Sequence, residues 1–485
     1  MADPLEMSDA GKTRSRRRSL GIALLLIVAV QGVGYWVVLD AGFVQDDYCW
    51  IEAAIRSLDS PGLVFSRCIS GFFRPLVHLV FMGNYALAGL HPSAYLAVNI
   101  LLEICCTLGL ALLVYQMTGD ARAAIIGAVV FASHPSHGEV VGWISARTSS
   151  LLALFGLSVL VCWLRWRQTR RWVWWICALA AFCLALLTKE EAPALLAALI
   201  ILEFALPSHE GKPLASVYRQ VWSAKWTLLP FLAATAGYLL LQHRFQSENP
   251  LVQGGAYTWD WAGLARDLSR LAGLFVYRGV VRTPWLYLVF GVEAVLAAAA
   301  LWRAPSGARR VVIAGLALAF VALLPSSFFV THSAARYNYV ATIGSSLAWA
   351  GLTTTVTRRR ALPAVVYSGV FVLLLLTIAG QMHHLGRKAA FWFDEQRQGQ
   401  RLLLAAQQAA PLLEEARASG RAVRVLDVPM QSAHLHSLLW LTGGVEPSKV
   451  TLGSTSDAAS RNRADDALIL RWDSADGVFK TVSPN

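Results

Sequence analysis

The chain has 485 residues, of which 56% are hydrophobic and only 15% are charged, whereas about a quarter of the residues in a soluble domain are charged. This composition excludes an ordinary soluble enzyme and predicts an integral membrane protein. The formal net charge of +12 does not indicate nucleic-acid binding, because the Lys and Arg residues lie in short clusters between apolar segments.

The amino-terminal segment, residues 1–19, is basic and precedes the first apolar run. It contains Arg14, Arg16, Arg17 and Arg18, and no small-residue cleavage site follows the apolar run. We therefore expect a cytoplasmic amino terminus and a retained signal anchor.

Long apolar segments recur along the chain. A membrane-spanning helix needs about 20 mostly apolar residues, and on this criterion we expect about 11 spans. They are 20–38, 96–116, 121–135, 148–164, 172–187, 191–206, 226–243, 284–302, 311–330, 338–356 and 362–381. The sequence thus predicts an all-α polytopic membrane protein with a transmembrane domain over residues 20–381.

The distribution of positive charge sets the expected orientation. When the spans alternate from a cytoplasmic start, the basic clusters all fall on the cytoplasmic side, as the positive-inside rule requires. These clusters are Asp120 with Arg122, Arg165–Arg171, Lys212–Lys225, Arg303–Arg310 and Arg358–Arg360. Segment 73–90 is therefore predicted to be a juxtamembrane helix in the first external loop, 39–95, because a further span would reverse the pattern. Segment 259–276 has the same amphipathic character.

The tail changes in composition from residue 382. A polar helix is expected over 394–419, a strand over 421–428 and a Ser-, Asp- and Arg-rich loop over 454–466. We expect a small extracytoplasmic α/β region over 382–485, in which no helical-repeat period is visible.

On this topology the unusual polar clusters all lie on the outer side. Ionisable groups near membrane depth are costly, so their occurrence on one side indicates a functional site. The clusters are Asp46-Asp47; Arg74 with His78; His134, His137, Glu139 and Arg147; Lys189-Glu190-Glu191; and Arg336-Tyr337-Asn338-Tyr339.

These clusters also have purely structural interpretations, and His134 and His137 suit anchors at the membrane interface. Asp46 and Asp47 suit the start of a helix, where acidic side chains are favoured. Lys189 is able to form an ion pair with Glu190 or Glu191.

A divalent metal is a further alternative for the histidine cluster. His134, His137 and Glu139 offer nitrogen and oxygen ligands, although their spacing differs from the zinc-protease pattern. Glu103 lies inside a span, where it either bonds a neighbouring helix or forms the floor of the site, and we favour the first.

Cys49 and Cys68 both fall in the first external loop. An oxidising compartment favours a disulfide there, but sequence does not fix the Cα separation that a disulfide needs. A bridge and two unpaired thiols are both open.

Together these segments resemble the GT-C superfamily of polytopic glycosyltransferases that use polyprenyl-phosphate-linked sugars. The likeness is to the protein O-mannosyltransferase-like branch, especially the transmembrane part of the transmembrane-and-tetratricopeptide-repeat mannosyltransferases. It extends over roughly residues 20–345. It rests on an ordered set of motifs: Asp46-Asp47, Phe73-Arg74-Pro75-Leu76, His91-Pro92-Ser93-Ala94-Tyr95 leading to Asn99, His134 to Arg147, Lys189-Glu190 and Arg336-Tyr337-x-Tyr339. The chain departs from that branch in showing no repeat array and in having Glu103 where a histidine is common.

The resemblance implies an inverting, metal-independent or weakly metal-linked transfer of a sugar from a polyprenyl phosphate to an acceptor hydroxyl at the outer face. Asp46 would match the family's catalytic base, with Asp47 as the alternative. Arg74, Lys189 and Arg336 are candidates for contact with the donor phosphate. The pocket would be shaped by His78, His134, His137, Glu139, Arg147, Glu190, Tyr337 and Tyr339.

The Ala- and Arg-rich composition is typical of a bacterial chain, which favours undecaprenyl phosphate over dolichol and the inner membrane, with the carboxyl terminus in the periplasm. The expected partners are the polyprenyl-phosphate sugar, membrane lipids and a glycan, lipid or protein acceptor; no cofactor is firmly expected, a divalent metal stays open, and no nucleic acid is expected. The competing interpretations are a polyprenyl-linked glycan ligase or polymerase, a lipid or solute transporter and an inactive scaffold.

Overall fold

The computed structural model describes most of the chain. The described residues are 4–66, 69, 71–205, 213–246, 253, 270, 273–274, 291, 295, 298, 301–302, 306–328, 334–358, 364–455 and 467–482. The chain divides into two compact units, which are described separately. The first comprises Met1–Trp36, Val98–Val141 and Ala146–Ala389, and the second comprises Val37–Ala97, Gly142–Ser145 and Ala390–Asn485.

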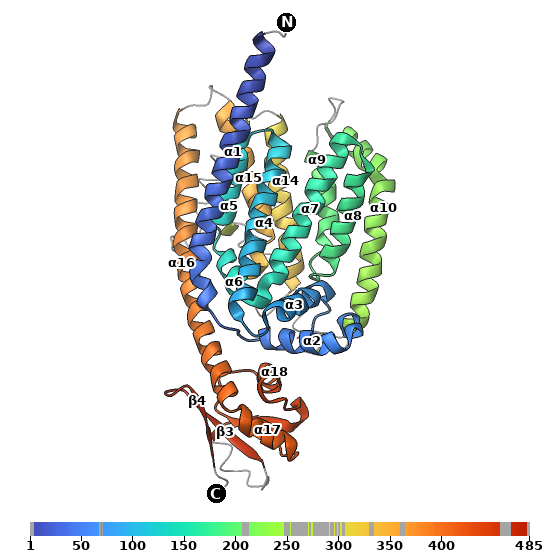
Figure 1. Cartoon of the computed structure of the whole chain (residues 1–485). Coiled ribbons are helices and arrows are strands. Elements are labelled where there is room, and N and C mark those ends of the chain that lie inside the picture. Colours follow the sequence, from blue (N-terminus) through green and yellow to red (C-terminus); the bar gives the residue numbers. More distant parts are fainter. Residues whose placement is uncertain are drawn as a thin grey trace. The chain divides into compact units, whose positions relative to one another are not determined.

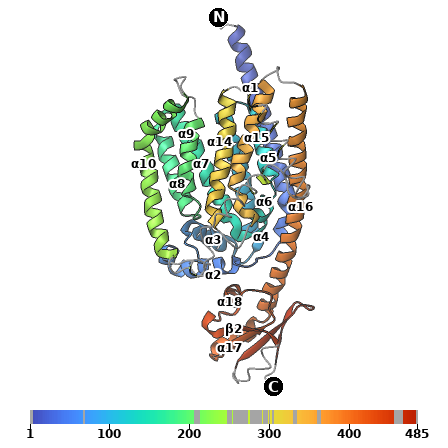
Figure 2. The same cartoon turned by 180° about the vertical axis from the view of Figure 1, so that it is seen from behind.

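The first unit is a bundle of α-helices, seen from opposite sides in Figures 1 and 2. Its helices follow the apolar segments of the sequence because a helix satisfies its own backbone hydrogen bonds, as a membrane requires. They are α1 (Pro4–Trp36), α4 (Pro92–Thr118), α5 (Ala121–Ala132), α6 (Ser136–Gly142), α7 (Arg147–Thr169), α8 (Trp172–Leu186), α9 (Ala194–Ala205), α10 (Pro213–Gln246), α14 (Ser306–Leu323), α15 (Ala341–Arg358) and the larger part of α16 (Ala364–Gln408).

The helices agree with the predicted membrane protein in type and place. Each predicted span except 284–302 overlaps one of these helices, and 284–302 lies almost wholly outside the described residues. Among the described residues, four helical segments are long and apolar enough to cross a membrane: Leu20–Asp40, Pro92–Thr118, Ile144–Thr169 and Ser306–Ser326. The all-α integral membrane class is therefore confirmed, while the count of about 11 spans stays a prediction.

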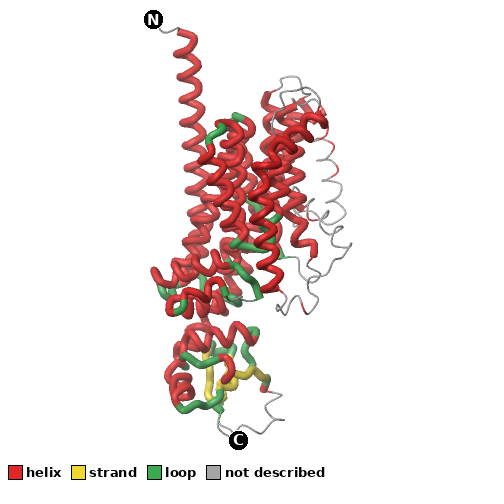
Figure 3. The backbone as a smooth tube through the Cα atoms, turned by 90° about the vertical axis from the view of Figure 1, so that its right-hand side faces the viewer, coloured by secondary structure: helices red, strands yellow, loops and turns green. Residues whose placement is uncertain are grey.

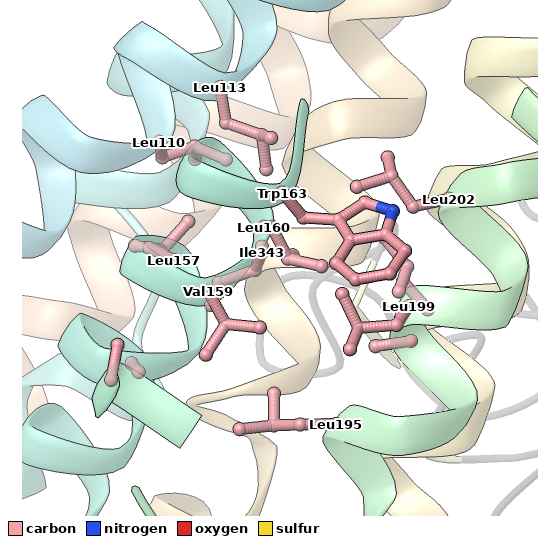
Figure 4. Packing of buried hydrophobic residues seen from close by; sticks show 14 of the residues in the cluster. Leu110, Leu113, Leu157, Val159, Leu160, Trp163, Leu195, Leu199, Leu202 and Ile343 are labelled. Carbon is pink, nitrogen blue, oxygen red and sulfur yellow. The ribbon is translucent and has the colours of Figure 1, made fainter. Parts of the chain in front are cut away.

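The core of the first unit is aliphatic and aromatic. Figure 4 shows Trp163 of α7 beside Leu160 and Leu199. Its indole N–H donates to Glu203 at 2.7 Å, and Arg167 lies 3.1 Å from the other oxygen of that carboxylate. The buried Glu203 thus has two partners, as a charge at this depth requires.

Helices α14 and α15 pack with their backbones in close contact. A Cβ added at Gly344 would lie 2.3 Å from the backbone nitrogen of Ala319, so only glycine fits there. Small residues at a helix interface are the usual means of close packing in membranes. This contact holds the carboxyl end of α14 against the start of α15, the helix that follows the Arg336 motif.

The second unit combines the first external loop with the tail. Its elements include the carboxyl-terminal part of α16, α2 (Asp47–Asp59), η2 (Pro61–Phe65), α3 (Pro75–Ala88), α17 (Ala410–Ala418) and α18 (Ser432–Gly443). Trp50 of α2 stacks on Phe81 of α3 with ring centroids 5.5 Å apart. Arg56 of α2 lies over Trp440 of α18 at 4.2 Å. The loop and the tail therefore share one core, and the predicted domain boundaries at residues 19 and 381 stay predictions.

A small sheet completes the second unit, with its strands yellow in Figure 3. The order is β2-β1-β3-β4, with β1 parallel to β2 and β3, and β3 antiparallel to β4. The strands are β1 (Val423–Leu426), β2 (Val450–Gly453), β3 (Leu468–Asp473) and β4 (Val478–Thr481).

The prediction for the tail was correct in part. The strand expected over 421–428 is β1, and the polar helix expected over 394–419 is the end of α16 followed by α17, with a break at Ala409. The loop expected over 454–466 lies mostly outside the described residues.

Candidate active site

The acidic pair occupies the start of α2, and its two members have different environments. Asp47 is fully buried: its Oδ2 accepts from the Val44 N–H at 2.9 Å, and its Oδ1 accepts from the Ser145 N–H at 2.8 Å and from the Ser145 hydroxyl. Asp46 is half-buried, at the N-cap position, and makes no capping hydrogen bond to α2. The capping interpretation thus explains the position of Asp46 but not its side chain.

The pKa of Asp47 is shifted by this environment. Burial, followed by the negative charge of Asp46, raises it to about 7, and the hydrogen bonds from Ser145 and Val44 oppose the shift. Asp47 is therefore an internal group that fixes the turn before α2.

The turn that carries the pair is packed tightly against α16. A Cβ added at Gly399 would lie 2.1 Å from the carbonyl oxygen of Phe43, so this helix position must be glycine. The Tyr48 hydroxyl donates to the carbonyls of Phe43 and Gly399, at 3.1 and 3.0 Å. Gln45, which lies between Phe43 and Tyr48 in the sequence, has a φ of +49°. This left-handed conformation costs a non-glycine residue about 1 kcal/mol or more. The packing holds a strained turn in place.

Arg74 and His78 lie at the start of α3 in the same unit. Arg74 is half-buried at the N-cap position, with its guanidinium 4.1 Å from the centre of the Phe72 ring. His78 is buried, and its Nε2 lies 3.0 Å from the Ser57 hydroxyl. Arg74 is thus the more accessible of the two.

In the first unit, His137 and Tyr339 meet at Glu103. The His137 Nδ1 lies 2.7 Å from Glu103 Oε1, and the Tyr339 hydroxyl donates to Oε2 at 2.6 Å. All three side chains are fully buried, and Gln31 of α1 also donates to Glu103, at 3.3 Å. The favoured interpretation of Glu103, a hydrogen bond to neighbouring helices, matches these contacts.

His134 and Glu139, the other two candidate metal ligands, have separate hydrogen-bond partners. His134 Nδ1 lies 2.7 Å from the Ser136 hydroxyl, while Glu139 accepts from the Arg336 guanidinium at 2.6 Å and from the Arg336 N–H at 3.3 Å. Across the described parts of the chain, no three His, Cys, Asp or Glu side chains are gathered as a metal site would need. The dependence of the chain on a metal stays a prediction.

Two basic side chains approach the ring of Tyr337 in this unit. Lys189 Nζ lies 5.3 Å from the ring centre and the Arg336 guanidinium 5.0 Å from it. Lys189 is 3% exposed and is held by Glu191 at 2.9 Å and by the Ser149 hydroxyl at 3.1 Å, whereas the Arg336 side chain is 27% exposed. Of the two carboxylates considered for Lys189, the ion pair is with Glu191.

Four further predicted residues are Arg147, Glu190, Cys49 and Cys68. Arg147 is fully buried as the first residue of α7, and Glu190 is half-buried. Cys49 contacts the tail, with Sγ 3.7 Å from the Ala433 carbonyl oxygen and 3.4 Å from the Ser437 hydroxyl. Cys68 lies outside the described residues, so the disulfide stays a prediction.

Part of the chain is similar to known mannosyltransferases. Residues 74–236 match the family described as dolichyl-phosphate-mannose-protein mannosyltransferase. The chain is 34% identical over 131 residues to mouse protein O-mannosyl-transferase TMTC2, which covers 26% of this chain and 16% of that protein. It is 28% identical over 232 residues to human protein O-mannosyl-transferase TMTC3, and the aligned part covers 45% of this chain and 23% of that protein. The chain thus spans about a sixth to a quarter of the length of these relatives.

Two solved structures share the fold. ArnT from Cupriavidus metallidurans, crystallised with undecaprenyl phosphate, aligns over 93% of both chains with a TM-score of 0.55 and 15% identity. The Archaeoglobus fulgidus oligosaccharyltransferase aligns over 91% of this chain and 65% of its own, with a TM-score of 0.52 and 12% identity. The chain therefore shares the fold of these two structures, and its residues 74–236 match the mannosyltransferase family.

The match to the mannosyltransferase family includes only part of the candidate site. It begins at Arg74, so it contains the His134–Arg147 segment and Lys189 but neither the acidic pair nor Arg336. The roles of those residues rest on the motif order and on the contacts described above.

Several residues that contact the candidate site were not predicted from the sequence. Ser145 anchors Asp47, Ser149 holds Lys189, and Gly399 lets α16 reach the acidic turn. Arg270 donates to Asn338 at 2.9 Å and to Ser326 at 2.8 Å. Of these residues, only Arg270 could have been identified from the sequence, because it is a charged residue next to apolar residues in the amphipathic segment 259–276.

Proposed function

We propose that this chain transfers a sugar from a polyprenyl-phosphate donor to an acceptor hydroxyl, with inversion at the anomeric carbon and with Asp46 as the general base. The hydroxyl oxygen attacks the anomeric carbon, its proton passes to Asp46, and the bond from that carbon to the phosphate oxygen breaks. Such a transition state resembles an oxocarbenium ion, so a base on one side and cations at the leaving group lower its energy.

The difference between the two acids carries this proposal. Asp47 is fully buried and accepts hydrogen bonds from Val44 and Ser145, whereas Asp46 is partly accessible beside it and is not used to cap α2. A general base must come within hydrogen-bonding distance of the attacking hydroxyl, which favours the accessible member. Asp47 then acts by fixing the turn from which Asp46 projects.

Three basic residues are proposed for the departing phosphate. Arg336 combines an exposure of 27% with a guanidinium, whose planar array of donors suits phosphate oxygens. Lys189 lies beside the same tyrosine ring, and Arg74 is the accessible cation of the second unit. Their carboxylate partners, Glu139 and Glu191, hold Arg336 and Lys189 in place.

The carrier and the location follow from the same proposal. The structural neighbour bound to undecaprenyl phosphate supports a polyprenyl phosphate as leaving group. We place the chain in a bacterial inner membrane, with its active site and carboxyl terminus on the periplasmic side, because the basic clusters then face the cytoplasm. The acceptor is a glycan, lipid or protein hydroxyl.

The test uses the purified full chain with labelled undecaprenyl-phosphate mannose and an extracted envelope fraction. Release of undecaprenyl phosphate together with labelled acceptor supports the proposal, and translocation of the donor without cleavage contradicts it. Asp46→Asn is expected to lower the rate by about 10²–10⁴, as loss of a general base does. Asp59→Asn, at the exposed end of the same helix, is the matched control and should retain the full rate. If Asp46→Asn stays active while Asp47→Asn does not, the role moves by one residue, and if both stay active, the acid–base mechanism is wrong.

A further inference from the structure

The second unit contains a pocket next to the acidic pair. It has a volume of about 260 Å³ and is lined by three segments: the turn before α2 (Val44, Gln45), α16 (Glu395, Gln398, Gly399, Leu402) and the tail from the loop after β1 into the first turn of α18 (Pro429, Met430, Gln431, His434). We call it the tail pocket. None of the residues proposed as the catalytic base or as phosphate contacts lines this pocket.

The pocket adjoins the turn that positions the proposed base. The Val44 N–H donates to Asp47, and Gln45, in the left-handed conformation, directly precedes Asp46. Gly399, which lines the pocket, is also the residue that meets Phe43. A ligand in the tail pocket would therefore lie against the same turn as Asp46.

The chemistry of the lining selects the ligand. Gln45, Gln398 and Gln431 each offer an amide that both donates and accepts, as hydroxyl groups do. None of the residues lining the pocket, all of them in the described part of the chain, is Lys or Arg, so the pocket lacks the cations that a phosphate needs. Its acidic residue, Glu395, accepts hydrogen bonds from hydroxyl groups and further disfavours an anion. Burial lowers the pKa of His434, which keeps its ring neutral at pH 7, able to donate and to accept.

The volume of the tail pocket and the segments that line it also favour a saccharide. The volume lies just below the roughly 300–1,000 Å³ of typical small-molecule sites, which suits one or two sugar rings. Peptides commonly bind by extending a sheet edge or by filling an apolar groove. The residues lining the tail pocket come from helix and loop segments, not from β1–β4.

From the proposed function and these observations, we infer that the tail pocket is the acceptor subsite and that it binds a neutral saccharide unit, whose hydroxyl is presented to Asp46. The acceptor is thereby assigned to the glycan class, and the tail takes part in its recognition.

The test measures binding of methyl glycosides of mannose, glucose, galactose and N-acetylglucosamine to the full chain in lipid nanodiscs, by saturation-transfer NMR. At least one glycoside should bind, and Gln398→Ala and Gln431→Ala should each weaken it about three- to tenfold, as expected for the loss of a neutral hydrogen bond. Gln407→Ala is the matched control, because Gln407 is exposed on α16 and does not line the pocket. Thermal unfolding of each variant checks that it is folded.

The outcomes separate this inference from the proposed function. Glycoside binding should persist in Asp46→Asn, since that change affects transfer only. The absence of binding by every glycoside, binding that the pocket variants leave unchanged, or binding of a serine-containing peptide in place of the sugars would each overturn the inference, whatever the result for transfer. If the pocket variants weaken glycoside binding while Asp46→Asn still transfers sugar, the saccharide site stands and the catalytic role of Asp46 fails.

Discussion

Ser145 donates to Asp47 twice: its backbone N–H lies 2.8 Å from Oδ1, and its hydroxyl donates to the same oxygen. The two residues are 98 positions apart in the chain. This contact ties the acidic turn to the end of the motif that begins at His134.

Ser145→Ala tests how much the hydroxyl contributes. At about pH 8, where Asp47 is ionised, loss of a hydrogen bond to a carboxylate should lower the free energy of unfolding by about 1.5–3 kcal/mol. The unfolding temperature of the detergent-solubilised protein measures the effect. In the control, Ser150→Ala removes a buried hydroxyl that donates to the neutral carbonyl of Arg147 at 3.0 Å, at a cost of about 1 kcal/mol. An equal loss in both variants would contradict a charge-assisted bond at Ser145.

The pH dependence of stability follows from the raised pKa of Asp47. Its pKa is about 7 in the folded chain and about 4 in the unfolded chain, so between these values only the folded chain holds the proton. The contribution of Asp47 to the free energy of unfolding is therefore greatest below about pH 4. It falls by about 1.4 kcal/mol per pH unit as pH rises through this window, and it is lost above about pH 7. We expect the unfolding temperature to fall more steeply between about pH 5 and pH 8 in the wild type than in Asp47→Asn. Parallel profiles would show that Asp47 does not titrate in this range.

Gly399→Ala tests the packing of α16 on the acidic turn. A Cβ there would lie 2.1 Å from the Phe43 carbonyl oxygen, so the turn must move. Overpacking of this kind costs about 1–3 kcal/mol or more, and displacement of Asp46 should reduce transfer by at least about tenfold. Gly83→Ala on α3 is the control, since nothing lies within 4 Å of its added Cβ. Normal transfer by Gly399→Ala would mean that the turn does not need this helix.

The role of Arg336 is separable from its ion pair with Glu139. Arg336→Gln alone leaves Glu139 without a charged partner in a buried site, so both folding and catalysis should suffer. The double variant Arg336→Gln with Glu139→Gln removes both charges and should recover the unfolding temperature. If Arg336 holds the donor phosphate, the double variant stays about tenfold or more weaker in KM for the polyprenyl-phosphate sugar. Full recovery of KM would reduce Arg336 to a structural partner of Glu139.

The helices were predictable because a membrane imposes a simple rule on sequence. A run of about 20 apolar residues needs no knowledge of its neighbours to be identified. The sheet was harder, since β2 and β4 have four residues each and their pairing depends on segments that are distant in sequence. Only β1, with its alternating Val423 and Val425, carried a local signal.

The residue types of the site were predictable, but their partners were not. Polar residues at membrane depth stand out in any composition, which is why His137, Glu139, Lys189 and Arg336 were found. Their contacts depend on side-chain direction: Lys189 reaches Glu191, two residues on, and leaves the adjacent Glu190 to other contacts. Serine and glycine, as at Ser145 and Gly399, are too common to be recognised before the fold is known.

The close contact of Gly399 with Phe43 has a practical consequence for experiments on the tail. A chain truncated before Ala390 would lack the surface on which the acidic turn rests, together with the second carbonyl that Tyr48 bonds. Its inactivity would then report a collapsed turn rather than a missing accessory domain. Function of the tail is better studied by single substitutions that leave Gly399 unchanged, or by exchange of segments that begin after Leu402, than by deletion.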